Sequence, residues 1–235
     1  MNDSDTHGTG GGCRVPAGRL LWSLVEDAVV VDRAEEDGGL SVVRVAHRVD
    51  VDRPSATVRE ALRRMCLGPV ALENVAGLRG SFASWRSGGD ECEPWREVKR
   101  MLDALGGMVV LSLTRDAAVE PLVSMSVVDA AGAVAPLALA EPERYGRVGL
   151  RPGVSVRRIG ASDVLQAEDS AYQLVLHAPP AIRVGEELSR GPRSAVELAG
   201  PDLGLPLVLD VLSFLTAART VERAADVPAE VLSRL

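Results

Sequence analysis

The chain of 235 residues is poor in aromatic side chains and has no evident set of paired cysteines. Aromatic residues make up only 3% of the chain, so aliphatic side chains, mainly Val, Leu and Ala, must fill the core. The three cysteines, Cys13, Cys66 and Cys92, are odd in number and widely spaced. This pattern argues against a disulfide framework and against a structural zinc site.

Long apolar runs are also absent. No run reaches about 18 residues, and the N-terminus lacks a basic segment followed by an apolar one. We therefore expect no transmembrane helix, no secretory signal and no membrane partner, which leaves a cytoplasmic protein as the default. The net charge is −7, from 26 basic and 33 acidic residues, so nucleic-acid binding would need a concentrated basic face.

Motifs for cofactors and nucleophiles are missing as well. The chain contains no G-x-G-x-x-G, P-loop or G-x-S-x-G motif, and the glycine run at 8–12 has no following Gly-Lys-Ser/Thr. His47 and His177 lie at or beside two corresponding strands, but no acidic residue has a spacing that would clearly orient either ring. We expect no catalytic residue, no metal site and no cofactor held by this chain alone.

The hydrophobic pattern begins with three β-rich runs followed by three helices. The runs lie at 28–32, 40–45 and 48–52, and the helices begin near Thr57, Val70 and Pro94. Thr57 and Glu60 have the spacing of a capping box, and Gly68-Pro69 ends the first helix. Residues 79–91 are predicted to form a loop, and Gly106-Gly107 ends the third helix.

The same order of elements returns in the second half. Strands are predicted at 154–159, 164–167 and 172–177, and helices at about 180–190, 194–200 and 206–223. Between the two series, strands are predicted at 108–113, 122–128 and 134–139, with a hairpin turn at 129–132.

The two halves also share residues. The segment 68–77 aligns with 191–200, and four of the ten positions are identical. Just upstream, 58–62 aligns with 184–188, and the small difference in offset falls in a turn, where insertions are tolerated. We interpret this as an internal duplication, with chance similarity between amphipathic helices as the alternative.

These patterns predict an α+β fold of tandem winged-helix-like modules, each with three short antiparallel strands and three helices, joined by a β-rich insert. The expected divisions are a flexible arm at 1–18, a first module at 19–107, a connecting segment at 108–147, a second module at 148–225 and a tail helix at 226–235. A sheet this small has an edge, to which an extended peptide can add as a further strand.

The second half resembles a known type of domain. Residues 150–157 (Leu-Arg-Pro-Gly-Val-Ser-Val-Arg), the helix ending at Gly191-Pro192, and residues 210–215 (Asp-Val-Leu-Ser-Phe-Leu) resemble the leader-peptide recognition domain of ribosomal-peptide biosynthesis. The peptide chaperone of pyrroloquinoline quinone biosynthesis is its stand-alone form. The resemblance covers about 148–223 and depends more on the order of elements than on single residues.

The whole chain resembles the N-terminal half of azoline dehydrogenases of the streptolysin S type. Those flavoenzymes oxidise thiazolines and oxazolines to thiazoles and oxazoles, and a flavin-binding domain follows the recognition half. The resemblance implies that FMN would be bound only together with a partner.

The family's binding mode implies a groove between the third strand and the third helix of the second module. The expected peptide-binding residues are Tyr172, Gln173, Leu174, Val175, Leu176, Leu207, Asp210, Val211, Phe214 and Ala218. The helix is apolar on a second face as well, formed by Leu207, Phe214 and Ala218, and this face must be buried. The candidates to cover it are a peptide, the other module, or a second copy of the chain in a homodimer.

The resulting hypothesis is a recognition and scaffold subunit in the biosynthesis of a modified ribosomal peptide, of azole-containing or thiopeptide antibiotic type. Its partners would be a precursor leader peptide, bound by strand addition, and a modifying enzyme such as a cyclodehydratase or flavin dehydrogenase. One alternative is a subunit or fragment of an FMN-dependent azoline dehydrogenase. A second is a winged-helix DNA-binding regulator, which the absence of Lys and Arg from 206–218 disfavours.

Overall fold

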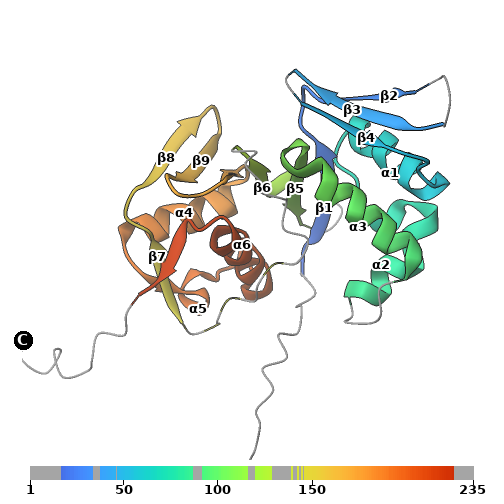
Figure 1. Ribbon diagram of the computed structural model, residues 1–235. Helices are drawn as coiled ribbons and strands as arrows, with labels where there is room; N and C mark the ends of the chain where they lie inside the picture. The colour runs from blue at the N-terminus through green and yellow to red at the C-terminus, as the bar shows by residue number, and fades with distance from the viewer. Residues whose placement is uncertain are drawn as a thin grey trace, which may run out of the picture.

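The computed structural model describes residues 17–33, 38–45, 47–86, 92–115, 120–128, 139, 142, 144 and 146–224. Helices and antiparallel strands are mixed along the chain, which confirms the expected α+β class. Figure 1 shows the helices of the first half on one side, those of the second half on the other, and the strands β5 and β6 between them.

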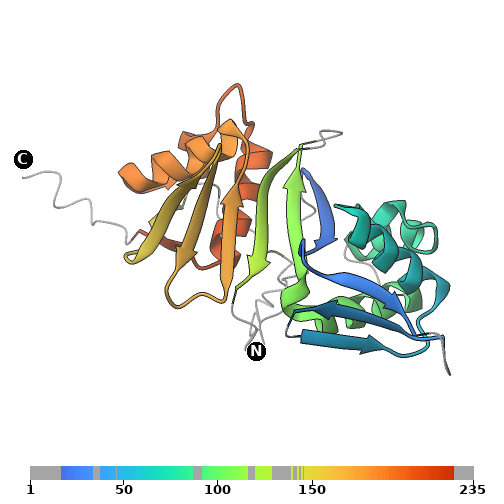
Figure 2. The ribbon, with the colours of Figure 1, turned by 90° about the horizontal axis from the view of Figure 1, so that it is seen from above.

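The main sheet has six strands and runs through both halves of the chain. Its order is β1 (Arg19–Leu24), β5 (Val109–Thr114), β6 (Pro121–Val127), β10 (Tyr172–Leu176), β9 (Ser162–Ala167) and β8 (Val154–Ile159). Every neighbouring pair is antiparallel. Seen from above, the yellow and orange strands of the second half continue into the green strands and blue β1 (Figure 2).

Two smaller sheets have three strands each. One has the order β2 (Val29–Asp32), β3 (Leu40–Arg44) and β4 (His47–Val51), and the other β11 (Arg193–Ser194), β7 (Arg147–Leu150) and β12 (Val221–Arg223). β4 and β12 each end a sheet, so each has a single pairing partner among the strands that the structure describes.

The helices lie in two corresponding sets. The first comprises α1 (Ala56–Leu67), two 3-10 turns (Leu72–Asn74 and Ala76–Leu78), α2 (Arg79–Arg86) and α3 (Glu93–Leu105); the second comprises α4 (Pro179–Arg190), α5 (Ala195–Leu198) and α6 (Leu205–Ala217). A further 3-10 turn, Gly106–Met108, leads from α3 into β5. Buried residues from both sets belong to one hydrophobic cluster.

Three local expectations were wrong. Ser55, rather than Thr57, caps α1, because the Ser55 hydroxyl accepts a hydrogen bond from the Val58 N–H. The segment expected to be a loop contains α2, an eight-residue helix whose Gly80, Ser81 and Ser84 favour a loop in the sequence. α6 ends at Ala217 because Arg219 adopts a φ of 54°, after which β12 forms where a longer helix was expected.

The strand pairings repeat along the chain, as a duplication requires. In the first repeat (β1 to β5), β1 pairs with β5 and makes a two-bond bridge from Trp22 to Val70. In the second repeat (β7 to β12), β7 pairs with β12 and with β11 at Arg193. Val70 and Arg193 are equivalent positions in the aligned segments 68–77 and 191–200, so sequence and pairing agree there. The expected alignment of 58–62 with 184–188 was wrong, because α1 and α4 are both 12 residues long and end at Gly68 and Gly191, which leaves no insertion between them.

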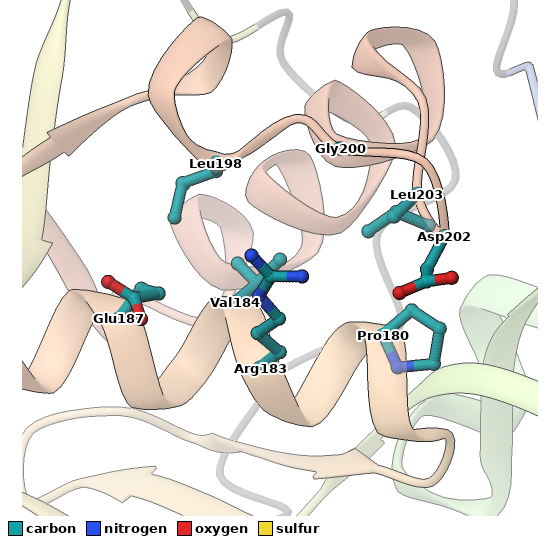
Figure 3. A pocket seen from close by; sticks show the side chains of 8 residues that line it. All are labelled: Pro180, Arg183, Val184, Glu187, Leu198, Gly200, Asp202 and Leu203. Atoms are coloured by element: carbon teal, nitrogen blue, oxygen red, sulfur yellow. The ribbon is translucent and has the colours of Figure 1, made fainter.

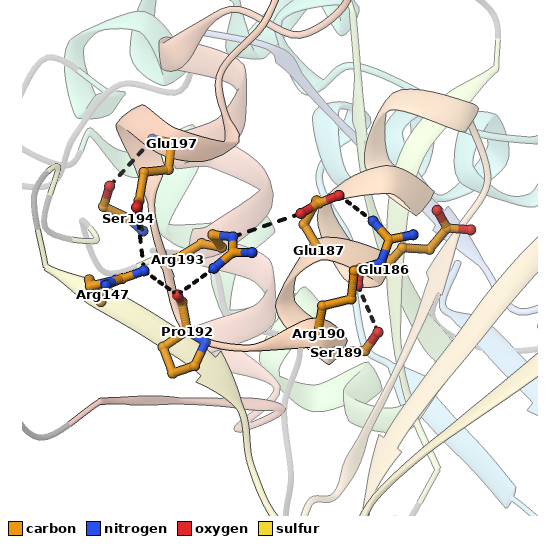
Figure 4. Close-up of polar contacts among 9 residues, drawn as sticks. All are labelled: Arg147, Glu186, Glu187, Ser189, Arg190, Pro192, Arg193, Ser194 and Glu197. Carbon is orange, nitrogen blue, oxygen red and sulfur yellow. Dashed lines mark hydrogen bonds and ion pairs between the residues drawn. The ribbon is translucent and has the colours of Figure 1, made fainter. Parts of the chain in front are cut away.

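The turn of the second repeat is held by polar contacts around Pro192 (Figure 4). The Arg147 guanidinium donates to the Pro192 carbonyl at 2.9 Å and lies 3.3 Å from the Glu197 carboxylate. Ser194 and Glu197 form the predicted capping box of α5. These contacts hold β11 and α5 against β7, the first strand of the same repeat.

Several expected features lie outside the described residues: the arm before residue 17, the turn at 129–132, the strand at 134–139 apart from Leu139, and the tail helix at 226–235. The other two strands expected in the connecting segment, β5 and β6, lie in the middle of the main sheet.

Candidate functional site

The expected binding strand, β10, has no free edge. It pairs with β9 on one side and with β6 on the other, so a peptide cannot add to it without displacing a strand. Leu174 and Leu176 are fully buried, and Tyr172, Gln173 and Val175 are half-buried. Both edges of β10 are thus already paired, so the expected addition of a peptide to this strand does not fit the sheet order.

The expected helix residues are likewise part of the core. Val211, Phe214 and Ala218 are fully buried, and Leu207 is half-buried. The Asp210 carboxylate, on a residue only 2% exposed, accepts a hydrogen bond from the Gly18 N–H at 2.8 Å. Asp210 thus holds the start of β1 against α6.

The segment that fills the expected groove is β6 of the same chain. It pairs with β10 along its length and contacts both α6 and α4. Val123, Met125 and Val127 alternate along β6 and are all buried. They share a sheet face with Leu176, which lies so close to α4 that a Cβ on Gly185 would be 2.8 Å from its Cδ1. An extended segment with apolar residues at alternate positions therefore occupies this site.

Backbone hydrogen bonds show which residues of β10 face β6. The His177 N–H donates to the Leu122 carbonyl at 2.9 Å, and this pair continues the β6–β10 register. Because hydrogen-bonded pairs alternate in antiparallel strands, Val175 and Gln173 also direct their backbone groups at β6.

The equivalent strand of the first repeat, β4, has an open edge. The Arg33 N–H donates to the Gly39 carbonyl at 3.0 Å, in register with the β2–β3 pairs. The same alternation then directs the backbone groups of Val49 and Val51 at β3, and those of Arg48 and Asp50 away from it. Within the described residues no strand pairs with that outer side.

Side chains are also less buried on β4, which has an open edge, than on β10, which is paired on both sides. Val49 and Val51, whose backbone groups face β3 as those of Leu174 and Leu176 face β9, are only half-buried although they pack against the core, whereas Leu174 and Leu176 are buried. β4 also contacts α3, as β10 contacts the helices of its own repeat. The open edge of β4 beside α3, which we call the β4 edge, is therefore the candidate site.

Polar side chains form one network beside the β4 edge. The Asp50 carboxylate accepts from the Ser41 hydroxyl at 2.6 Å and from the Arg48 guanidinium at 2.8 Å. These hydrogen bonds, that from Ser41 first, lower the pKa of Asp50. The network fixes both side chains on the face opposite Val49 and Val51, where they leave the backbone edge accessible.

Several arginines lie on α1 and α3, and acidic side chains lie beside four of them. Arg59 and Arg63 both lie at Asp32, at 2.7 and 3.6 Å. Arg96 and Arg100 both lie at Glu93, at 3.2 and 3.0 Å. Neighbouring carboxylates weaken the positive potential that a polyanion would need. The buried α6 also cannot insert into a DNA groove as it stands.

His177 follows β10 directly, and its ring lies beside a pair of serine hydroxyls. Its Nε2 is 2.9 Å from the Ser124 hydroxyl, which is 2.8 Å from the Ser112 hydroxyl. Partial burial lowers the pKa of His177. Across the described residues, no three His, Cys, Asp or Glu side chains are grouped as a metal site.

A small pocket lies between α4 and the segment that runs from the end of α5 to Leu203 (Figure 3). Arg183, Glu187 and Asp202 lie around it with apolar residues of both segments. It holds no pair of groups arranged as nucleophile and base, so we assign it no chemistry.

Sequence reasoning missed the β4 edge because the resemblance to the leader-peptide recognition domain, from which the binding residues were taken, covers only about 148–223. The duplication was the available signal, since it maps the strand at 172–177 onto the strand at 48–52. The duplication did not reveal that, among the described residues, the connecting segment supplies the strand β6 to β10 but no strand to β4.

No protein-family model matches the chain, and a search of curated proteins found no match. Within the residues that the structure describes, no helix has the length and apolar character needed to cross a bilayer.

Proposed function

We propose that this chain is a peptide-recognition subunit built from two winged-helix-like modules. It binds the leader of a ribosomally made precursor peptide as an added β-strand and presents that peptide to a modifying enzyme. The observation that carries the proposal is the pairing of β6 with β10 and its contact with α6, together with the open edge of the equivalent strand β4.

The physical reasons are those of strand addition. The outward backbone groups of Arg48 and Asp50 can form main-chain hydrogen bonds to a peptide, which supply affinity without regard to its sequence. The half-buried Val49 and Val51 offer apolar surface that an added strand would cover. The acid-matched arginines of α1 and α3 favour a peptide over a polyanion as ligand.

The test is purification of the tagged chain from its native host, followed by mass spectrometry of proteins and small peptides. We expect a short precursor peptide together with a cyclodehydratase or a flavin enzyme. Recovery of duplex DNA with no peptide, under low-salt and high-salt washes, would contradict the proposal and support a regulator instead.

A further inference from the structure

The strands that end a sheet differ in how their outer edges are protected. An edge with unpaired backbone groups can pair with another chain, and proteins usually guard it with charged side chains. β4, β8, β11 and β12 all carry such side chains, and β1 is bridged on its outer side to Val70. β2 instead has three successive valines, 29–31, before Asp32. Among the described strands that end a sheet, β2 is therefore the least guarded.

Two of the three valines of β2 are exposed to solvent. Val29 is 52% exposed and Val31 is 47% exposed, and both lie on the sheet face opposite the buried Leu40. Asp32 is the only charged residue of β2, and its carboxylate accepts a hydrogen bond from Arg59 of α1 at 2.7 Å. The edge thus offers exposed apolar side chains, and its single charge is already paired.

Backbone hydrogen bonds show which groups of β2 point outward. The Arg33 N–H donates to the Gly39 carbonyl at 3.0 Å, so the odd-numbered residues of β2 direct their backbone groups at β3. The N–H and carbonyl groups of Val30 and Asp32 therefore point away from β3. No strand in the described part of the chain pairs with that side. Figure 1 shows β2 along the outer margin of its small sheet.

We infer that β2 pairs with β2 of a second copy of this chain, antiparallel and with Val30 opposite Val30, to form a homodimer around a two-fold axis. In that register Val29 of each copy lies opposite Val31 of the other, so all three valines meet valines. Arg33 of each copy also lies near Asp27 of the other, which is opposite in charge.

Other registers fit less well. The outward backbone groups belong to even-numbered residues, so a shift by one residue would leave these groups without partners. A shift by two residues in either direction would set Asp32 opposite Val30, or Asp27 opposite Val31. The pattern of β2 is therefore complementary to itself in one register, which favours a second copy as the occupant over an unrelated strand.

The size of the contact predicts a weak and closed assembly. A two-fold contact uses the same edge of both copies, so it stops at two chains. A pairing of about five residues per copy is small among protein interfaces, and we expect a dissociation constant on the order of tens of micromolar. β4 lies at the other end of the small sheet and stays open, so the inference does not depend on the proposed function.

Sedimentation equilibrium of the full chain, at about 1 to about 500 µM, measures the dimerisation. Val30→Pro removes the outward N–H at the centre of the pairing without touching the ladder to β3. Val30→Ala is its matched control, since it also loses the valine side chain, which packs partly against the core, but keeps the N–H. We expect Val30→Pro to dimerise about thirtyfold more weakly than Val30→Ala, because two hydrogen bonds are lost in each dimer.

An exchange of charges tests the register without altering the backbone. Val29→Lys and Val31→Asp change exposed side chains that face each other across the proposed dimer, so a mixture of the two variants should form the heterodimer in preference to either homodimer. The matched control is a mixture of Val29→Lys and Val29→Asp, in which the same charges do not lie opposite each other. It should favour the heterodimer less in native mass spectrometry.

A monomer at every concentration would overturn the inference, because the β2 edge would then stay open in solution. Equal dissociation constants of the two Val30 variants, or equal preference for the heterodimer in both mixtures, would also overturn it, since the copies would then meet through another surface.

Discussion

At the scale of single residues, His177 connects the two halves of the main sheet through the Ser124 hydroxyl. Because burial lowers its pKa in the folded chain, the unfolded chain binds more protons as the pH falls below about 6.5. The contribution of His177 to stability is therefore complete above that pH and decreases below it, until the folded pKa is reached.

We expect the free energy of unfolding to fall between pH 7.5 and pH 5.5, and to fall less in His177→Asn. Urea denaturation at several pH values measures how the free energy of unfolding changes with pH in the unmodified chain and in His177→Asn. An equal slope in the two proteins would show that another group controls this pH range.

Gly18 is the residue whose side-chain position is most crowded near the Asp210 contact. A Cβ there would lie 2.7 Å from Leu113 Cδ1 and 2.8 Å from the Thr114 carbonyl oxygen. We expect Gly18→Ala to destabilise the chain by about 1–3 kcal/mol in chemical denaturation. Gly80→Ala in α2 is the control, because nothing lies within 4 Å of its Cβ, and it should be neutral or stabilising. Equal effects of both substitutions would exclude crowding as the cause.

For single residues, the sequence could indicate which side chains matter, but it could not indicate their hydrogen-bond partners. Asp210 was expected to bind a peptide, but its carboxylate accepts a hydrogen bond from the backbone N–H of Gly18, which is 192 positions away. No spacing rule reaches that far. Arg48 and Asp50 were passed over because outward backbone groups are set by the strand register, which the residues do not reveal.

At the scale of elements, α1 depends on the cap at Ser55. The Ser55 hydroxyl accepts from Val58 N–H, and the Ser55 N–H donates to Glu97 of α3 at 3.0 Å, so one residue starts a helix and joins it to another. We expect Ser55→Ala to lower the free energy of unfolding by about 1 kcal/mol. Ser55→Thr retains a capping hydroxyl and should remain close to the unmodified chain in the same denaturant titration.

Most elements could be predicted because their apolar periods are regular. The strand β8 has the predicted bounds, and α4 and α3 begin within one residue of them. β6 was predicted as a strand, yet its position between β5 and β10 was not, since pairing between distant strands depends on three-dimensional packing. α2 escaped prediction because it is only eight residues long and contains Gly80, Ser81 and Ser84, which are weak helix formers.

At the scale of the whole molecule, the two repeats share one core and one sheet. All three tryptophans, Trp22, Trp85 and Trp95, belong to the first repeat, so their fluorescence reports on that repeat alone. Leu188→Ala in α4 of the second repeat removes a side chain that is 2% exposed and should cost about 2–5 kcal/mol.

We expect this substitution to shift the tryptophan transition and the circular dichroism transition by the same amount, because the repeats unfold together. Leu62→Ala in α1 should behave identically. If Leu188→Ala left the tryptophan fluorescence transition unchanged, the two repeats would be independent folding units.

The placement of β6 also fixes how many peptide molecules one chain can hold. A duplicated protein would ordinarily offer two equal sites, and binding would show two equivalents. Here the linker between the copies saturates one site permanently, so titration should end at one peptide per chain, with no cooperativity between copies. Under the proposed function, a partner enzyme that meets this complex would receive a single peptide in a single orientation.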